Sequence, residues 1–404
     1  MTQTPLAARE QVSILTTSTL FPNEVQPSHG IFVETRLRKL VESGAVKAHV
    51  LAPVPWLPPH VSYGGLGPLW SVPHHEERHG IPIEHPRYFV IPKIGMNVTP
   101  YTLYWSMRAE LKRLLAKGLT VDLIDAHYFY PDGVAAVWLG REFNLPVVIT
   151  ARGTDISLIP NYAYPCKLIL EAADLADGLI TVCQALKDGL VELGVSADRI
   201  TVLRNGVDLD LFQPRDRDAL RQKMQLNGFT IASVGHLIER KGHHRVIEAL
   251  ASLPDVTLLI AGDGPERSAL QALSARLGVL DRVRFLGVLD QSSLCDVYNS
   301  ADALVLASSR EGWANVLLEA MSCGTPVIAS AVWGTPEVVS GPAAGRLMPS
   351  LDVQGVIAGL VSLRESLPDR KATRHYAEGF DWQSTTNGQL KLFRNILGQP
   401  NWVS

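Results

Sequence analysis

The chain has 404 residues, of which 46% are hydrophobic and 19% charged, and its formal net charge is −3. This balance is typical of a globular protein and excludes a disordered or collagen-like chain. The small net charge argues against a nucleic-acid partner. At roughly 150 residues per domain, the length predicts two or three domains.

The cysteines and the apolar runs indicate where the protein works. The four cysteines are Cys166, Cys183, Cys295 and Cys323. None of them forms a C-x-x-C pair, so we expect neither a metal or redox pair nor a disulfide framework. The first apolar run is short, and the long uncharged stretches are broken by Pro and Gly, so we expect no leader and no membrane span. Together these features favour a cytoplasmic protein.

Short β-branched runs alternate with helical patterns along the whole chain. In the first half the predicted strands are 12–16, 47–52, 121–126, 147–151, 179–183 and 200–203. In the second half they are 230–234, 256–261, 283–286, 303–307 and 326–329. Such alternation predicts an α/β fold with parallel sheets that helices cover on both faces.

The strand pattern stops near 205–215, where a polar run begins and Pro214 interrupts it. This break predicts an N-terminal domain over 1–212 and a C-terminal domain over 213–380. Residues 381–404 are predicted to form one further helix. The segment 53–85 is rich in Pro, Gly and His and is predicted to be a long loop.

The most informative segment is 310–328, with the sequence REGWANVLLEAMSCGTPVI. A helix is predicted to begin near Asn315, and its first backbone N–H groups are suited to hold a phosphate. Glu311, just ahead of the helix, is placed to accept hydrogen bonds from a polyol. Glu319, about one turn inside, is placed to accept from two vicinal hydroxyls such as those of a ribose. The alternative is that both glutamates are solvated charges at a helix end.

This segment resembles the Glu-seven-residues-Glu signature of the retaining glycosyltransferases of family four. Further stretches resemble that family in order and spacing. These are Asn205–Asp208 with Phe212, Val234–Leu237 with Lys241-Gly242, Ile260–Pro265, and Gly334–Val339. The resemblance runs from about Gly30 to Trp382. It implies the GT-B fold, in which two Rossmann-like doubly wound domains face each other across a cleft, with acceptor-side residues in the first, the nucleotide-sugar donor in the second, and the last helix crossing back to the first.

The resemblance implies three catalytic residues. Lys241 would lie on the donor pyrophosphate and neutralise the charge that builds on the leaving diphosphate. Glu311 would hold hydroxyls of the donor sugar. His127, which follows the strand 121–126, would place a neutral imidazole near the reacting sugar. The alternatives are an exposed loop lysine for Lys241 and a packed internal histidine for His127.

The resemblance also implies a set of donor-binding residues, formed by glycines, the start of the helix and its glutamate. They are Gly30, His236, Gly264, Gly312, Trp313, Ala314, Asn315, Val316 and Glu319. At Gly30 the missing side chain would let donor and acceptor approach the backbone. A simple turn glycine is the alternative there.

Two positions depart from the family pattern. His236 stands where the family often has Arg, and histidine offers at most one charge, half-titrated near its ordinary pKa of about 6.5. Arg152, in Ala-Arg-Gly-Thr-Asp, stands where the family commonly shows His-Gly-x-Asp. Arg152 would bring a compensating cation to the cleft, or it would pair with Asp155 and shape the loop.

The sequence predicts no metal and no cofactor besides the nucleotide-sugar co-substrate. Asp208 and Asp210 have the D-x-D spacing of metal-dependent transferases. They lie in the crossover between domains, apart from the expected phosphate loop, and are therefore not taken as ligands. The histidines show no pair with metal-ligand spacing on one helix face.

The sequence favours a retaining glycosyltransferase in polysaccharide biosynthesis that uses a UDP-sugar or, next, GDP-mannose. The expected acceptor is a glycan or a lipid-linked glycan. Two alternatives are a non-catalytic sugar-nucleotide-binding protein and a sugar-nucleotide epimerase of similar fold. A peripheral contact with the inner face of the membrane is suggested by the stretch 93–117, which has five basic residues, one acidic residue and interleaved aromatics. An amphipathic helix whose aromatics face the core is the alternative.

Overall fold

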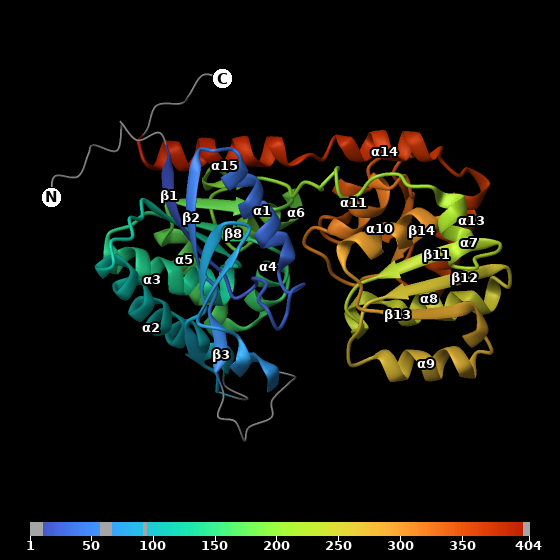
Figure 1. The fold of residues 1–404 in the computed structure, drawn as a ribbon, viewed down its shortest axis with the longest axis horizontal. Coiled ribbons are helices and arrows are strands. Elements are labelled where there is room, and N and C mark those ends of the chain that lie inside the picture. Colours follow the sequence, from blue (N-terminus) through green and yellow to red (C-terminus); the bar gives the residue numbers. More distant parts are fainter. Residues whose placement is uncertain (1–10, 57–66, 92–94, 399–404) are drawn as a thin grey trace. The chain divides into compact units, whose positions relative to one another are not determined.

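The computed structural model describes residues 11–56, 67–91 and 95–398. The chain divides into two compact units (Figure 1). Unit 1 comprises Met1–Leu203 together with Gln383–Ser404, and unit 2 comprises Arg204–Trp382. Each unit has its own sheet and its own hydrophobic core.

Unit 1 is built on an eight-stranded sheet with the order β10-β9-β8-β7-β1-β2-β5-β4. Its strands are β1 (Val12–Thr17), β2 (Val46–Leu51), β4 (His75–Arg78), β5 (Ile81–Glu84), β7 (Leu123–His127), β8 (Val147–Ala151), β9 (Gly178–Thr181) and β10 (Ile200–Val202). All neighbouring strands are parallel except β4 and β5, which pair antiparallel at one edge. Two further strands, β3 (Val54–Trp56) and β6 (Arg87–Phe89), form a separate parallel pair.

Helices cover both faces of the unit 1 sheet (Figure 1). They are α1 (Ile31–Glu42), α2 (Gly95–Ala116), α3 (Val134–Phe143), α4 (Thr154–Ser157), α5 (Ala163–Leu175), α6 (Gln184–Glu192) and α15 (Trp382–Ile396). The C-terminal helix α15 packs on the same face as α1, where Leu390 and Phe393 share one core with Val33 and Leu37. The last helix of the chain is therefore part of the first unit.

Unit 2 is built on a six-stranded, wholly parallel sheet with the order β13-β12-β11-β14-β15-β16. Its strands are β11 (Phe229–Val234), β12 (Val256–Ala261), β13 (Val283–Gly287), β14 (Ala303–Leu306), β15 (Val327–Ser330) and β16 (Gly345–Met348). Its helices are α7 (Arg217–Lys223), α8 (His243–Ala249), α9 (Arg267–Arg276), α10 (Gln291–Ser300), α11 (Asn315–Ser322), α12 (Thr335–Val338), α13 (Val353–Glu365) and α14 (Arg370–Glu378). Counted within the unit, the strand order is 3-2-1-4-5-6, the doubly wound Rossmann order.

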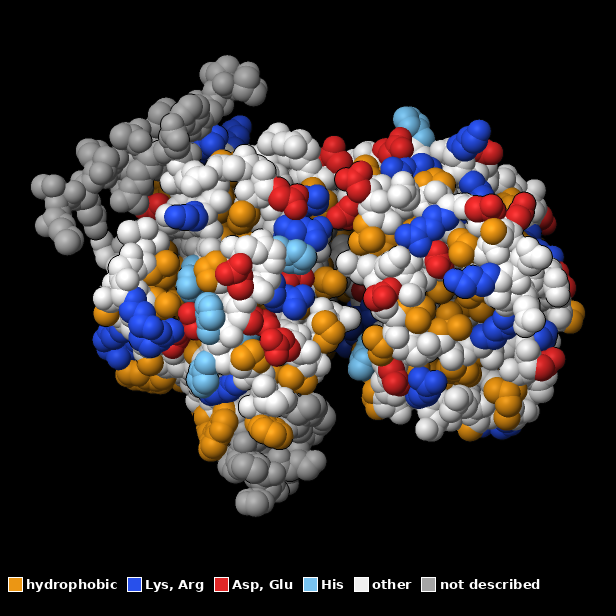
Figure 2. Space-filling view, in the orientation of Figure 1, with side chains coloured by type: hydrophobic (Ala, Val, Ile, Leu, Met, Phe, Trp, Pro, Cys, Tyr) orange, Lys and Arg blue, Asp and Glu red, His pale blue; other side chains and the backbone are white. Residues whose placement is uncertain are grey.

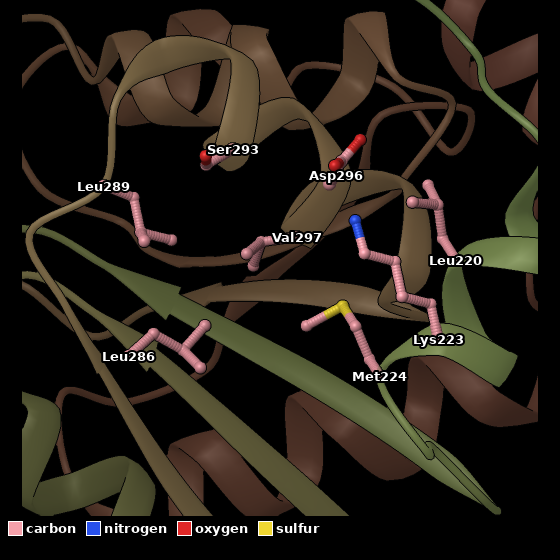
Figure 3. A pocket seen from close by; sticks show the side chains of 8 residues that line it. All are labelled: Leu220, Lys223, Met224, Leu286, Leu289, Ser293, Asp296 and Val297. Carbon is pink, nitrogen blue, oxygen red and sulfur yellow. The ribbon is translucent and has the colours of Figure 1, made fainter.

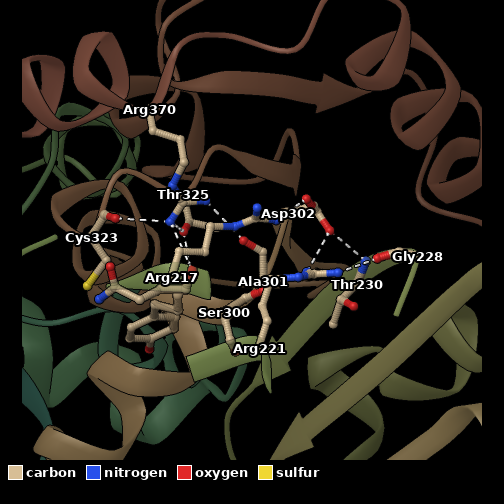
Figure 4. Close-up of polar contacts among 12 residues, drawn as sticks. Arg217, Arg221, Gly228, Thr230, Ser300, Ala301, Asp302, Cys323, Thr325 and Arg370 are labelled. Carbon is tan, nitrogen blue, oxygen red and sulfur yellow. Dashed lines mark hydrogen bonds and ion pairs between the residues drawn. The ribbon is translucent and has the colours of Figure 1, made fainter. Parts of the chain in front are cut away.

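A polar network fastens the outer helices of unit 2 to the amino ends of its strands (Figure 4). Asp302, just before β14, accepts hydrogen bonds from Arg217 at 2.5 Å and Arg221 at 3.3 Å, both on α7. Arg370, at the start of α14, donates to the carbonyls of Ala301 and Cys323 at 3.0 and 3.1 Å. These contacts stabilise the amino end of the sheet. Doubly wound sheets bind their ligands at the opposite, carboxyl end.

The structure confirms the predicted α/β class with two Rossmann-like parallel sheets. Each predicted strand has a counterpart whose bounds differ by at most two residues. The prediction of a long loop over 53–85 was wrong, because β3, β4 and β5 lie within it; residues 57–66 are outside the described part. The strand β4 has the sequence His-Glu-Glu-Arg at a sheet edge, so it lacks the apolar run on which the prediction relied.

Candidate functional site

The strand order of unit 2 marks one place for a ligand. β11 and β14 are parallel neighbours, and the connections that leave them run to opposite faces, through α8 and α11. The carboxyl ends of such a strand pair leave a crevice in which doubly wound proteins bind their ligands. The loops there are 235–242 after β11 and 307–314 after β14. They contain the predicted catalytic residues Lys241 and Glu311 and four of the nine residues predicted to bind the donor.

Backbone contacts fix these two loops against each other. Gly242 has φ +72°, and a Cβ built on it would lie 2.0 Å from the carbonyl oxygen of Ala307. The Ser309 amide donates to the Arg240 carbonyl at 2.8 Å, and the Arg240 guanidinium donates to the Arg310 carbonyl at 2.8 Å. Only glycine permits this approach, so the turn that carries Lys241 is held at the end of β14.

These contacts bring Lys241 and Glu311 together. The Lys241 ammonium donates to the Glu311 carboxylate over 2.6 Å, with side-chain exposures of 17% and 9%. Two opposite charges at this depth attract more strongly than they would in open solvent. A ligand with a phosphate and a hydroxyl would match the pair, because the ammonium suits the anion and the carboxylate accepts from the hydroxyl.

The helix α11 begins beside this pair, after Gly312. Its N-cap residue Ala314 provides no side-chain hydrogen bond to the first turn. The Asn315 amide donates to the Trp313 carbonyl at 3.1 Å, so the Val316 amide is the one best suited to an anion. Trp313 is buried and packs 6.1 Å from the ring of Phe380, and its indole N–H has no hydrogen-bond partner among the described residues. The predicted phosphate-binding backbone is therefore present as an uncapped helix start.

Glu319 lies one turn inside α11 and meets Tyr298 from α10. The Tyr298 hydroxyl, on a fully buried side chain, donates to the Glu319 carboxylate at 2.8 Å. Burial raises the pKa of Glu319 to about 7, and the tyrosine hydrogen bond acts in the opposite direction. Glu319 is therefore poised between its acid and carboxylate forms near neutral pH. Sequence reasoning missed Tyr298, because no pattern linked α10 to this glutamate.

Two further predicted donor residues lie in the neighbouring loops. His236 is exposed in the loop after β11, where its carbonyl accepts from the Ile238 amide at 2.9 Å. Gly264 follows β12, and a Cβ on it would lie 2.5 Å from the Leu237 carbonyl oxygen. The close packing of two backbones already accounts for the glycine at 264, so its part in donor binding stays a prediction.

Unit 1 has a corresponding position at the carboxyl ends of β1 and β7, which are parallel neighbours. Gly30 ends the loop after β1 with φ +67°, and a Cβ there would lie 2.2 Å from the Leu20 carbonyl oxygen. In the same loop Thr19 donates through its amide and its hydroxyl to Asp132, at 2.5 and 2.8 Å. The glycine is therefore required by backbone packing, and its predicted contact with a donor stays a prediction.

His127 and Arg152 meet at the ends of β7 and β8. The His127 ring is fully buried, and its Nδ1 lies 2.5 Å from the Arg152 guanidinium. Its Nε2 lies 3.1 Å from the Asp125 carboxylate. Burial and the nearby Arg152 lower the pKa of His127 to about 4, against the effect of Asp125. The ring is therefore neutral at physiological pH, and it contacts an arginine that is itself 8% exposed.

Asp155 shapes the loop that carries Arg152. Its carboxylate accepts from the main-chain amides of Phe129 at 2.7 Å, Arg152 at 3.1 Å and Gly153 at 2.6 Å. The acid thus organises the loop through the backbone, while the Arg152 guanidinium lies over the Phe32 ring at 5.5 Å and reaches His127. The link between the two departures, His236 and Arg152, stays a prediction.

The first aspartate of the D-x-D pair caps a turn in the structure. Asp208 accepts from the Leu211 amide at 3.1 Å and so caps a turn. Among the described residues, no group of three His, Cys, Asp or Glu side chains is arranged to hold a metal ion. A separate cavity of about 210 Å³ lies among α7, α10 and the end of β13 (Figure 3), and none of the residues predicted for the site lines it.

The aromatic and basic stretch forms α2, whose one face is buried through Leu103, Met107 and Leu111. Tyr101 and Trp105 are 40% and 60% exposed, so the alternative that the aromatics face the core was wrong for these two. The basic charges are largely paired: Arg108 and Lys112 contact Glu142, and Arg113 contacts Glu84 and Glu110. Lys93 lies outside the described residues. No described helix is both long enough and apolar enough to cross a membrane.

Comparison with known proteins agrees with this arrangement. Residues 65–211 match the family model Glycosyltransferase Family 4, and residues 216–380 match Glycosyl transferases group 1. A D-inositol 3-phosphate glycosyltransferase of Mycobacterium tuberculosis is 32% identical over 307 residues, which are 69% of this chain and 63% of that protein. The chain thus spans less than two thirds of the length of the curated relatives that it matches.

Solved structures share the fold. Sucrose-phosphate synthase from Thermosynechococcus elongatus superimposes with a TM-score of 0.77 at 20% identity, over 96% of this chain and 100% of that one. Anabaena HepE in complex with UDP gives a TM-score of 0.71 at 20% identity, over 95% and 100%. With both units matched by models of one glycosyltransferase architecture, the chain belongs to the family four, group 1 glycosyltransferases and has the GT-B fold.

Proposed function

We propose that this protein is a retaining glycosyltransferase that moves a sugar from a nucleotide diphosphate sugar to a glycan or lipid-linked glycan. The observation that carries the proposal is the Lys241–Glu311 pair, 2.6 Å apart beside the uncapped start of α11. A cation, the amide end of a helix and a carboxylate are the three groups that a sugar diphosphate needs in one place. Glu319, one turn further, is suited to a nucleotide ribose.

The donor is proposed to be a UDP-sugar, with GDP-mannose as the second choice. HepE, which shares the fold, has been solved with UDP and with UDP-glucose, and this supports uridine at the corresponding place. The carboxylate form of Glu319 accepts from the ribose hydroxyls, a contact that every such nucleotide offers. Glu319 therefore does not distinguish one nucleotide base from another, and the base must be identified by experiment.

The proposed reaction breaks the bond between the sugar C1 and the diphosphate oxygen and forms a bond from C1 to an acceptor oxygen. Negative charge builds on the leaving diphosphate, where Lys241 and the α11 amides stabilise it. The acceptor approaches from the face that the diphosphate leaves, and a diphosphate oxygen takes the acceptor proton. Configuration at C1 is then retained, and the step needs no metal ion and no cofactor.

The acceptor is proposed to be a glycan, free or lipid-linked, of a polysaccharide pathway. Arg152, held by His127 in unit 1, offers a fixed cation for a phosphate of a substrate. Exposed aromatic side chains of unit 1 suit contact with a membrane that presents such a lipid. They include Trp56, Phe89, Tyr101 and Trp105, and Figure 2 shows hydrophobic side chains gathered beside β3 on one face.

Product analysis distinguishes this proposal from a non-catalytic binder and from an epimerase. Purified protein is incubated with UDP-sugars or GDP-mannose, a glycan or lipid-glycan extract, and EDTA. Nucleotide diphosphate release with transfer of the labelled sugar in the retained configuration supports the proposal, provided that Lys241→Ala abolishes both. Interconversion of two sugar nucleotides with no transfer indicates an epimerase. Nucleotide binding without turnover in any extract indicates a binding protein.

A further inference from the structure

A buried polar layer lies at the carboxyl end of the unit 1 sheet, beneath α1 and α15. Side chains two residues apart on a strand share one face, so Leu123, Asp125 and His127 of β7 all point toward these helices. Leu123 belongs to the apolar core there, whereas Asp125 and His127, further along the strand, are fully buried and polar. A buried carboxylate beside a buried imidazole requires partners, because burying an unpaired charge is costly.

The partners come from the last helix and the first one. The Arg36 guanidinium of α1 donates to Gln389 Oε1 at 2.8 Å, and Gln389 Nε2 donates to Asp125 Oδ2 at 3.0 Å. The side chains of Arg36 and Gln389 are each about 1% exposed. Since arginine only donates and an ionised carboxylate only accepts, the Gln389 amide has one possible orientation between them.

This arrangement also fixes the proton of His127. An arginine has no lone pair to offer, so Nδ1, 2.5 Å from Arg152, must be the acceptor and carries no proton. The proton of the neutral ring is then on Nε2, which lies 3.1 Å from the same Asp125 oxygen that Gln389 contacts. This is a close electrostatic contact without the geometry of a hydrogen bond. A protonated ring would place two N–H groups against one arginine and one acid, and the arginine contact would be lost.

We propose that Asp125 and Gln389 are positioning residues that hold His127 in its Nε2–H tautomer and thereby fix the guanidinium of Arg152. The chain of contacts runs from Arg36 through Gln389, Asp125 and His127 to Arg152, and it connects the C-terminal helix to the residue at the end of β8. For its effect on transfer, this inference rests on the proposed function. A small displacement of a group that orients a substrate lowers the rate by about tenfold to a hundredfold.

The tautomer is measured directly by ¹⁵N NMR on protein labelled at histidine, with His127→Gln used to assign the signal. We expect Nε2 protonated and Nδ1 unprotonated from about pH 5 to 8. A protonated Nδ1, or a ring that titrates above pH 6, in the wild-type protein overturns the inference.

Gln389→Leu and Asp125→Asn test the consequence, with Gln383→Leu as a matched control, because Gln383 is an exposed residue of the same helix. We expect Gln389→Leu to change the His127 signals and to lower the rate of transfer by tenfold or more. Nucleotide-sugar affinity, which depends on unit 2, should stay within twofold. Changed His127 signals with an unchanged rate overturn the positioning role. If the wild-type protein transfers no sugar at all, the proposed function fails, and the NMR result alone decides the tautomer.

Discussion

The Lys241 ammonium lies 2.6 Å from the Glu311 carboxylate, although 70 residues separate them in sequence. The contact exists because β11 and β14 are neighbours in the sheet while the chain forms two other strands between them. Gly242 lets the turn of Lys241 touch the end of β14, so the distance is set by backbone packing. A donor would have to separate this pair, taking the ammonium for its phosphate and the carboxylate for its sugar.

Replacing Lys241 and replacing Glu311 should therefore impair different steps of the reaction. Lys241→Ala should lower the turnover by about 10² to 10³, since one electrostatic contact to the developing charge is lost. Glu311→Gln should preserve affinity for the nucleotide diphosphate and lower transfer, because the amide is a weaker acceptor for the sugar hydroxyls. Steady-state kinetics measures the loss of turnover, and calorimetry with UDP measures the affinity for the nucleotide diphosphate. Lys371→Ala, an exposed lysine of α14, is the control; equal losses there would refute a specific role.

Nucleotide-sugar binding should depend on pH through Glu319. The pKa of this acid is raised to about 7, so it is protonated below that value and ionised above it. Only the ionised form accepts from both ribose hydroxyls, so affinity should rise about tenfold from pH 6 to pH 8. The Kd is measured with a UDP-sugar, whose phosphates do not titrate in this range.

Glu319→Gln should bind with an affinity that does not change over this pH range. His375→Gln is the matched control, because it removes an exposed imidazole of α14, outside the predicted site, and should leave the pH dependence in place. A pH dependence that survives in Glu319→Gln would show that another group causes it.

The stability of the fold should fall in mild acid because two buried histidines stay neutral. Burial lowers the pKa of His127 and of His243 to about 4, below the ordinary 6.5. The unfolded chain takes up these protons between pH 6.5 and 4, so the stabilisation is complete above 6.5 and is lost as the pH falls. Each group contributes up to about 1.4 kcal/mol per pH unit in that window. Urea unfolding of wild type and His243→Gln at pH 7 and 5 measures this loss. An equal fall in the free energy of unfolding from pH 7 to pH 5 in both proteins would contradict the prediction.

The loop after β12 should tolerate no side chain at Gly262. This glycine has φ +140°, and a Cβ would lie 1.9 Å from the Gly235 carbonyl oxygen. Gly262→Ala must therefore displace the loop that leads to Lys241, and it should weaken both folding and nucleotide binding. Gly278, with φ +66° and no atom within 4 Å of a built Cβ, is the control and should cost only about 1 to 2 kcal/mol. Unfolding curves that match for the two variants would rule out the clash.

Much of this architecture could be predicted from the sequence, for identifiable reasons. The runs 147–151 and 256–261 are apolar except for one threonine each, as expected of strands covered on both faces, and both were predicted with the bounds that the structure has. The segment 310–328 carries its glutamates and its helix start within one stretch of chain. Local patterns therefore located the Glu311 loop and α11 without any knowledge of distant contacts.

The site residues that the sequence did not predict depend on contacts between positions far apart in the chain. Gln389 reaches Asp125 across 264 residues, and nothing near Gln389 in the sequence distinguishes it from the exposed Gln383. Asp125 could have been noticed, since it stands two residues before His127 on one strand and so shares its face. Tyr298 has no such local signal. For Gly30 and Gly264, close packing of the backbone and a ligand contact both predict glycine, so the sequence could not separate the two.

The central claim is that the loops after β11 and β14, with α11, form a nucleotide-sugar site. Thermal unfolding of wild type and Glu319→Ala with UDP, GDP, ADP and their sugar conjugates tests it most directly. A ligand at one hundred times its Kd should stabilise the wild type by about 2.7 kcal/mol, a shift of several degrees. We predict such a shift for one nucleotide family, favouring UDP, and its loss in Glu319→Ala. No shift with any nucleotide, or an equal shift in the variant, would contradict the account.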